Sequence, residues 1–238
     1  MKYCIIHGSP RKGNCFKVTT LLKQELQALG EGVFVEFFLP QDLPHFCIGC
    51  YNCFEKGEEY CPHAKYVQPI VTAMSEADVL IFTTPVYVLA ESGAMKAFLD
   101  HLAYMFMVHR PKEAMFAKVA LVVSTTAGAG TGKAMKPLRL NLRFWGVKRS
   151  MPLGITMRAM SWEGMGAKQQ LKYDKLIKKR ARGLYALAKR RETMAIPLFA
   201  KALLWMMRKM IAGYDDTNLD KRYWQEKGWL DRGRWPYS

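Results

Sequence analysis

Short apolar runs alternate with segments of helical periodicity through most of the chain, and this alternation limits the fold more than any other feature. We expect strands at residues 2–7, 33–39, 78–84, 118–125 and 147–156. We expect helices at residues 15–29, 66–75, 92–106, 133–145 and 167–191. Strands that alternate with helices form parallel sheets, because each crossover helix returns the chain to the same end of the sheet. The sequence therefore predicts an α/β fold, a doubly wound parallel sheet with helices on both faces.

The composition is that of a globular protein. Half of the 238 residues are hydrophobic, and no run reaches the roughly 18 consecutive apolar residues of a membrane-spanning helix. No charged and apolar leader opens the chain, since a short apolar run leads directly into Gly8. Six cysteines without an export signal indicate reduced thiols or metal ligands. We therefore expect a soluble, cytoplasmic protein.

Positive charge is concentrated in the second part of the chain. Residues 1–132 carry 11 Lys and Arg against 12 Asp and Glu, whereas residues 133–238 carry 25 against 8. Such a field attracts a phosphorylated cofactor, an anionic membrane surface, an acidic protein or a nucleic acid, or it serves solubility alone. No helix-turn-helix, zinc-finger pair or RNA-binding aromatic motif accompanies the charge, which argues against nucleic acid as a partner.

Four cysteines follow one another at short spacings. They are Cys47, Cys50, Cys53 and Cys61, in the pattern C-x2-C-x2-C-x7-C-P. Bacterial iron–sulfur motifs share the two-residue spacings and the final proline. Structural zinc sites more often use two separated pairs, although His45 and His63 flank this segment and offer further zinc ligands. The pattern favours a 4Fe–4S cluster and leaves a zinc site, a disulfide or free thiols as alternatives.

The loop after the first predicted strand has the character of a phosphate-binding loop. It reads Gly-Ser-Pro-Arg-Lys-Gly-Asn from residue 8 and leads into a predicted helix. Small residues let the backbone approach a ligand, and the N–H groups at a helix N-terminus attract a phosphate. Arg11 adds a planar, charged hydrogen-bond donor.

Two further loops follow the strands predicted at residues 78–84 and 118–125. The first contains Pro85, which fixes a turn, and Tyr87, which can stack on an aromatic ligand. The second nearly matches a nucleoside-triphosphate loop, but Ala134 stands where a Mg²⁺-binding hydroxyl is required. We interpret it as a glycine-rich turn that approaches the edge of a flat ring. Ligands of parallel sheets bind beyond the carboxyl ends of the strands, where these loops lie.

These loops together resemble the flavodoxin-like NAD(P)H-dependent FMN reductase family. The match rests on Ser-Pro-Arg-Lys-Gly-Asn at 9–14 and on Thr-Pro-Val-Tyr at 84–87, followed by Ser-Gly and Lys-Ala-Phe-Leu-Asp within 92–100. The cysteine segment looks like that of the iron–sulfur flavoprotein branch. The resemblance covers about residues 1–160 and implies a five-stranded flavodoxin-like sheet, noncovalently bound FMN and NAD(P)H as co-substrate. This sequence departs from the family pattern at two positions: Cys15 stands where a hydroxyl residue is usual, and His101 stands where an arginine is usual.

The resemblance also implies the cofactor contacts. Five residues would surround the FMN phosphate, namely Ser9, Arg11, Asn14, Cys15 and Phe16. Five more would border the isoalloxazine ring, namely Pro85, Val86, Tyr87, Thr126 and Gly128. The four cysteines would hold a 4Fe–4S cluster, a one-electron exit towards a small-molecule or protein acceptor.

The last part of the chain lies outside this resemblance. We divide the sequence into an FMN-binding domain at residues 1–194 and a basic, aromatic-rich extension at residues 195–238. Residues 196–211 form a strongly apolar predicted helix with Lys201 and Arg208 on one narrow face. Such a helix packs on its own domain, joins subunits in a homo-oligomer, or lies on a membrane surface. We expect the aromatic residues at 223–230 to be exposed and to cover a neighbour's flavin site.

The sequence thus predicts an FMN-dependent oxidoreductase that accepts electrons from NAD(P)H or from a reduced carrier. One alternative is a plain NAD(P)H:FMN or quinone reductase whose cysteines are free or bind zinc. An alternative of another class is a flavoprotein without catalysis that senses redox state or binds polyanions.

Overall fold

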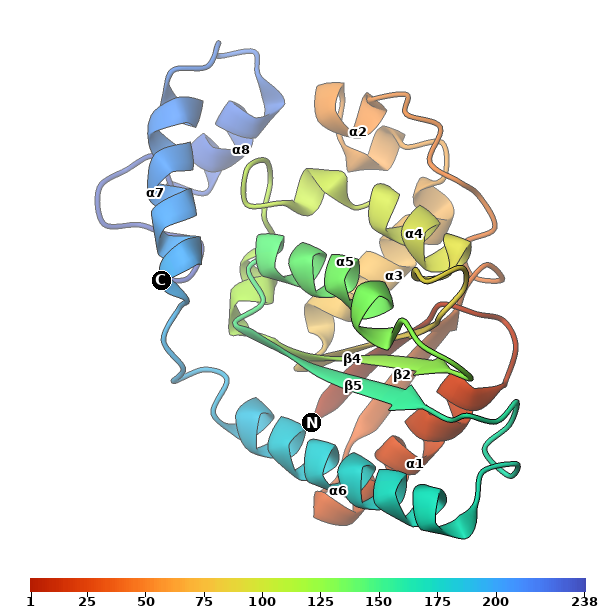
Figure 1. Cartoon of the computed structure of the whole chain (residues 1–238). Coiled ribbons are helices and arrows are strands. Elements are labelled where there is room, and N and C mark those ends of the chain that lie inside the picture. The colour runs from red at the N-terminus through yellow and green to blue at the C-terminus, as the bar shows by residue number, and fades with distance from the viewer.

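The computed structural model describes residues 1–238 and contains one five-stranded sheet in which every strand pair is parallel. The strands follow the spatial order β2-β1-β3-β4-β5 (Figure 1). Their bounds are Lys2–His7 for β1, Val33–Phe38 for β2, Val79–Pro85 for β3, Val119–Thr126 for β4 and Arg149–Thr156 for β5. The predicted doubly wound parallel sheet is confirmed, and each strand end lies within two residues of its predicted position.

Helices cover both faces of the sheet (Figure 1). One face carries α1 (Asn14–Leu29) and α6 (Ala167–Lys189), and the other carries α3 (Ala64–Glu76), α4 (Gly93–Asp100) and α5 (Thr131–Phe144). Alternate residues of β1 enter different cores: Cys4 and Ile6 pack with α3, α4 and α5, whereas Tyr3 and Ile5 pack with α1 and α6. Because both faces are buried, the strands have no polar side, which explains their near-continuous apolar sequences.

The helix predicted at residues 92–106 is wrong in its second half. α4 ends at Asp100, and a short 3-10 turn follows at Ala103–Met105. Leu102, Tyr104 and Met105 are buried in the same core as α4. Their apolar spacing therefore reflects burial and not one continuous helix. The short helix α2 (Asn52–Glu55), within the cysteine segment, is a further element that the sequence did not predict.

The C-terminal residues fold against the earlier part of the chain. α7 (Leu198–Ala212) and α8 (Leu219–Glu226) enclose a third hydrophobic core that also contains Met107 and Phe116. Trp224 and Trp229 are fully buried in that core. The expectation that these terminal tryptophans are exposed and cover a neighbour's site is wrong, because their own chain buries them. None of the helices combines the length and the apolar composition that crossing a membrane would require.

Candidate functional site

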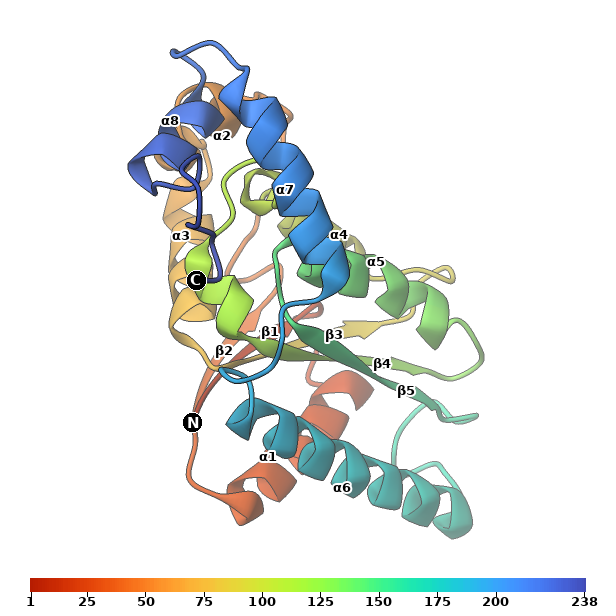
Figure 2. The same ribbon diagram turned by 90° about the vertical axis from the view of Figure 1, so that its left-hand side faces the viewer.

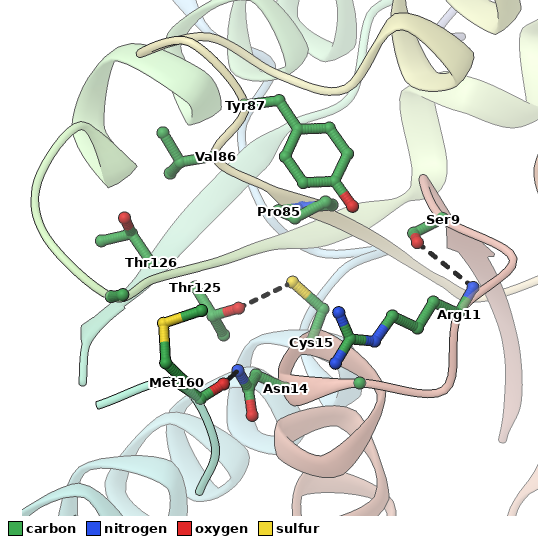
Figure 3. Close-up of a pocket in the computed structure, with 12 residues that line it drawn as sticks. Ser9, Arg11, Asn14, Cys15, Pro85, Val86, Tyr87, Thr125, Thr126 and Met160 are labelled. Carbon is green, nitrogen blue, oxygen red and sulfur yellow. Dashed lines mark hydrogen bonds between the residues drawn. The ribbon is translucent and has the colours of Figure 1, made fainter. Parts of the chain in front are cut away.

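A pocket opens at the carboxyl edge of the sheet (Figure 3). Its walls come from the loops that follow β1, β3, β4 and β5. The residues that line it are Ser9, Arg11, Gly13, Asn14, Cys15, Pro85, Val86, Tyr87, Thr125, Thr126, Ala127 and Met160. This is the edge at which ligands of open parallel sheets bind.

The loop after β1 is fixed to its neighbours by its first residue. Gly8 donates its N–H to the carbonyl oxygen of Thr83 over 2.7 Å, and it accepts a hydrogen bond from the Ser92 hydroxyl. A Cβ atom at Gly8 would lie 2.9 Å from both Ser92 Oγ and Thr83 O. Only glycine therefore fits where the loop passes between β3 and the start of α4.

The N-terminus of α1 faces this pocket without a side-chain cap. Gly13 is the N-cap residue and has no side-chain oxygen to bond the N–H groups of the first turn. Arg11 donates its backbone N–H to Ser9 Oγ over 3.2 Å, and its guanidinium points into the pocket (Figure 3). Backbone donors, a helix dipole and a guanidinium thus converge where a phosphate would fit.

Asn14 and Cys15 hold the pocket walls together with their side chains. The amide of Asn14 donates to Met160 O over 2.9 Å and accepts from the N–H of Trp162 over 3.1 Å. Cys15 Sγ lies 3.1 Å from Thr125 Oγ1, and burial raises the pKa of the Cys15 thiol. These two side chains join α1 to the loop after β5 and to the end of β4, which leaves the backbone N–H groups of Asn14 and Cys15 for a ligand.

A tight turn after β3 presents Tyr87. Tyr87 and Ala90 exchange two backbone hydrogen bonds of 3.0 Å, and the residues between them, Val88 and Leu89, have φ values of 49° and 62°. Left-handed backbone is rare for a β-branched residue and stores strain. The turn leaves the Tyr87 ring half exposed at the pocket mouth, where it can stack on a flat ligand.

The pocket is lined by eight of the ten residues that we assigned to FMN. Phe16 packs near the rings of His7 and Phe38, and Gly128 donates its N–H to Thr126 Oγ1 over 3.2 Å. The other four lining residues are Gly13, Thr125, Ala127 and Met160. The first three lie in or beside loops that the sequence singled out, although they were not assigned to FMN, whereas the sequence did not indicate Met160. Met160 could have been found, because the loop after β5 also lies at the carboxyl edge. The FMN contacts themselves stay a prediction.

The four cysteines of the motif lie in one segment between β2 and α3, with Cys53 in the short helix α2 and the other three in the loops around it. Cys47 and Cys50 are exposed, whereas Cys53 and Cys61 are half-buried. Gly49 and Tyr51 between them adopt left-handed backbone with φ of 66° and 59°, which bends the loop. Burial, and then the nearby Cys61, Cys47 and Cys50 thiols, raise the pKa of Cys53. The four thiols are thus near one another, but no three of their sulfur atoms lie within 4.8 Å of one another, and the 4Fe–4S cluster stays a prediction.

A second donor set shares one of these cysteines. Ligand atoms of Cys61, His63 and His101 all lie within 4.8 Å of one another. His63 Nδ1 is 3.0 Å from His101 Nε2, and His101 Nδ1 is 2.8 Å from the carbonyl oxygen of Ala97. A backbone acceptor on the second ring nitrogen is the usual way in which a metal-binding histidine is oriented. The ring of His45 stacks on His63 at a centroid distance of 4.6 Å.

Arg110 connects the cysteine loop to the C-terminal extension. Its buried guanidinium donates to the carbonyl oxygen of Cys53 and forms an ion pair with Asp220 of α8. Asp220 also bonds His109 Nδ1 over 2.8 Å, and Glu58 lies 3.6 Å from Arg110 Nε. A buried charge is stable only when it is paired, so this network holds the loop and the extension together.

The sequence of this chain is similar to that of known flavin-dependent proteins. The family model described as NADPH-dependent FMN reductase matches residues 1–154. An iron-sulfur flavoprotein of Clostridioides difficile is 33% identical over 135 residues, which cover 55% of this chain and 56% of the relative. An iron-sulfur flavoprotein of Methanocaldococcus jannaschii is 34% identical over 134 residues, which cover 55% of this chain and 67% of the relative. The chain thus spans little more than half the length of the first relative.

Solved structures confirm the flavodoxin-like fold. The structure of an FMN-dependent NADH-azoreductase from Bacillus anthracis superposes with a TM-score of 0.60. The superposition covers 78% of this chain and 100% of that chain, at 12% sequence identity. At this identity the likeness concerns the fold alone.

Proposed function

Because the chain belongs to the NADPH-dependent FMN reductase family, we propose that it is an FMN-dependent oxidoreductase that takes electrons from NAD(P)H or from a reduced carrier. The observation that carries this proposal is the pocket in which the uncapped N-terminus of α1, Arg11 and Tyr87 meet. FMN, when bound, supplies hydride and electron chemistry that no side chain of the pocket offers.

The pocket residues fit the two chemically different ends of FMN. Ser9, Arg11 and the first-turn N–H groups of α1 would bind the phosphate through charge and hydrogen bonds. Asn14, Cys15 and Phe16 would act through these N–H groups, because their side chains are bonded or packed elsewhere. The ring would be bordered by Pro85, Val86, Tyr87, Thr126 and Gly128.

We also propose a 4Fe–4S cluster on Cys47, Cys50, Cys53 and Cys61. Support comes from the grouping of the four thiols and from two matched relatives that are named iron-sulfur flavoproteins. Such a cluster would supply a one-electron exit from the flavin to a small-molecule or protein acceptor. We further expect the protein to form a homo-oligomer.

Anaerobic purification of the full chain tests this function. The flavin, iron and acid-labile sulfide per chain are measured first, and the oxidation of NADH and NADPH with a soluble acceptor follows. Stoichiometric FMN, about four irons per chain and steady turnover would support the proposal in full. FMN without turnover would favour a redox-sensing or polyanion-binding flavoprotein, and the absence of any flavin would refute the proposed function.

A second candidate is a plain NAD(P)H-dependent flavin or quinone reductase that holds a single zinc ion. The observation that favours it is the Cys61–His63–His101 donor set, because sulfur and imidazole nitrogen are typical zinc ligands. Two variants separate the candidates. Cys47→Ser removes a cluster ligand and leaves the zinc set intact, whereas His101→Ala does the reverse. If Cys47→Ser loses iron and His101→Ala retains it, the metal content favours the cluster. If Cys47→Ser retains zinc and His101→Ala loses it, the metal content favours the single zinc ion.

A further inference from the structure

α7 is apolar on two opposite faces. One face, with Ala200, Leu204, Met207 and Ile211, is buried in the third core. The opposite face carries four exposed apolar side chains, which we call the outer stripe: Leu198, Trp205, Met206 and Met210, with exposed fractions of 82%, 55%, 51% and 47%. In Figure 2, α7 stands at the front with no other element across it. The exposed Lys209 lies on the same face, beside Trp205. Exposed apolar side chains that cluster on one face in this way mark an interaction surface.

A basic groove begins where the outer stripe ends. It has a volume of about 700 Å³ and lies between α5, the start of β5 and the segment that leads into α7. We call it the basic groove and define it by five cations: Lys136, Arg139, Arg143, Lys148 and Arg149. Leu198 lines the groove and also begins the outer stripe, so the two surfaces are continuous.

Four of the groove cations have no acidic group or backbone carbonyl as a partner, whereas Lys148 donates to the carbonyl oxygens of Arg191 and Glu192 over 2.6 and 3.2 Å. None of the five takes part in an ion pair, and no Asp or Glu lines the groove. Arg143 stacks on the Phe199 ring at 3.6 Å, and Lys209 lies 3.9 Å above the ring of Trp205 in the stripe. Aromatic rings beside lysine and arginine are typical of side chains that lie at a membrane–water interface.

We propose that the outer stripe and the basic groove form one docking surface for an anionic phospholipid bilayer. The groove would receive lipid phosphates, and the stripe would enter the boundary between headgroups and acyl chains. Both parts are needed, because apolar burial and attraction to anionic lipid each contribute to the binding of an interfacial helix.

Charge favours a bilayer over the other occupants of this surface. A second copy of the chain, paired symmetrically through the stripe, would bring the basic grooves and Lys201 and Lys209 of two strongly cationic chains together. A nucleic acid would neutralise the groove but would leave the apolar stripe in water. An anionic bilayer satisfies both surfaces at once.

The docking surface lies away from the candidate flavin pocket. The groove includes Lys148 and Arg149 at the amino end of β5, whereas the flavin pocket lies beyond the carboxyl ends of the strands. A bilayer on α7 would therefore leave the pocket open to soluble substrates.

Co-sedimentation of the full chain with vesicles tests the proposal. The vesicles contain phosphatidylcholine alone or phosphatidylcholine mixed with phosphatidylglycerol. We expect binding to the anionic vesicles only, weakened when NaCl is raised from about 0.1 M to about 0.5 M. The fluorescence of Trp205 should shift to shorter wavelength on binding, with Trp205→Phe as the reference.

Paired variants separate a built surface from net charge. Lys136→Glu with Arg149→Glu should weaken binding by about tenfold or more, and Trp205→Ser with Met206→Ser should weaken it comparably. Lys175→Glu with Lys179→Glu on α6 makes the same change in net charge on exposed residues and should have little effect. The proposal would be overturned if the α6 control lost as much vesicle binding as the paired variants, or if the protein did not bind anionic vesicles at all. It would also be overturned if the protein failed to bind vesicles and formed a dimer that Trp205→Ser dissociates.

Discussion

Asn14 and Met160 are 146 positions apart, yet the Asn14 side-chain amide donates a hydrogen bond to the Met160 carbonyl oxygen over 2.9 Å. The same amide accepts the N–H of Trp162 over 3.1 Å. One side chain thereby ties the first turn of α1 to the loop after β5. The family resemblance assigned Asn14 to the FMN phosphate. In this structure the side chain of Asn14 bonds the loop after β5 and so helps to close the pocket.

Replacing Asn14 with alanine should therefore loosen the flavin pocket without unfolding the protein. Losing the two hydrogen bonds to the loop after β5 should lower FMN affinity by about tenfold. Gln24→Ala, at an exposed position on the same helix, is the control and should leave affinity unchanged. Fluorescence titration of FMN into both variants gives the dissociation constants. Equal affinities would show that this link does not shape the pocket.

Arg11 should recognise the phosphate and not the ring. Charge-assisted hydrogen bonds to a phosphate are worth about 1.5–3 kcal/mol, so Arg11→Ala should weaken FMN binding by about 10- to 100-fold. Riboflavin, which lacks the phosphate, should bind the variant and the wild type equally. Lys12→Ala removes a neighbouring exposed charge and is the control for general electrostatics. A parallel loss of riboflavin affinity would contradict the assignment of Arg11.

Val88 should be a source of strain next to the site. Its side chain is 99% exposed while its φ is 49°, so it has strain without compensating burial. Val88→Asn should stabilise the protein by about 1 kcal/mol, because asparagine tolerates left-handed backbone. The same change at Val33, an exposed residue in a strand, should be neutral or destabilising. Thermal unfolding of both variants decides this, and a less stable Val88→Asn protein would mean that the turn is not strained.

His7 should make stability depend on pH on the acid side of neutrality. Burial lowers the pKa of His7, although hydrogen bonding to Glu36 partly opposes this effect. Below the unfolded pKa of about 6.5, the unfolded chain therefore takes up a proton that folded His7 resists. Above that pH, the contribution of His7 to the unfolding free energy should be constant. Below it, this contribution should fall as the pH decreases towards the lower pKa of His7 in the folded protein. Thermal melts between pH 7.5 and about 5 should show this slope, and His7→Gln should flatten it. Parallel slopes in the two proteins would refute the assignment.

Asp220 should matter far more for stability than other acidic residues of the extension. It is buried and pairs with the buried Arg110. Asp220→Asn should cost about 3 kcal/mol of unfolding free energy, because it leaves a buried guanidinium without its main countercharge. Asp216, whose side chain is 85% exposed, pairs with Lys221, and Asp216→Asn should cost less than about 1 kcal/mol because solvent screens the carboxylate. Urea unfolding gives the loss of unfolding free energy in each variant. Equal losses would contradict the prediction that the buried pair of Asp220 and Arg110 contributes more to stability than the pair of Asp216 and Lys221.

Local sequence explains most of the fold and part of the site. The runs at β1, β3 and β4 identify buried parallel strands, because only such strands are apolar on both faces. The loop from Gly8 to Asn14 indicates a phosphate site, since small residues and a helix start have a local chemical meaning. The same reasoning misplaced the end of α4, because buried Leu102 and Tyr104 continue the apolar spacing beyond the helix.

The sequence by itself determined the parallel sheet, the cysteine motif and the glycine-rich loops, because periodicity, spacing and backbone freedom are properties of neighbouring residues. Only the tertiary structure decided that Met160 lines the candidate flavin pocket, that Arg110 joins Cys53 to Asp220, and that His101 lies beside His63. It also decided which face of α7 stays exposed. These relationships join residues far apart in the chain, and they depend on how the elements pack in space, which no local pattern encodes.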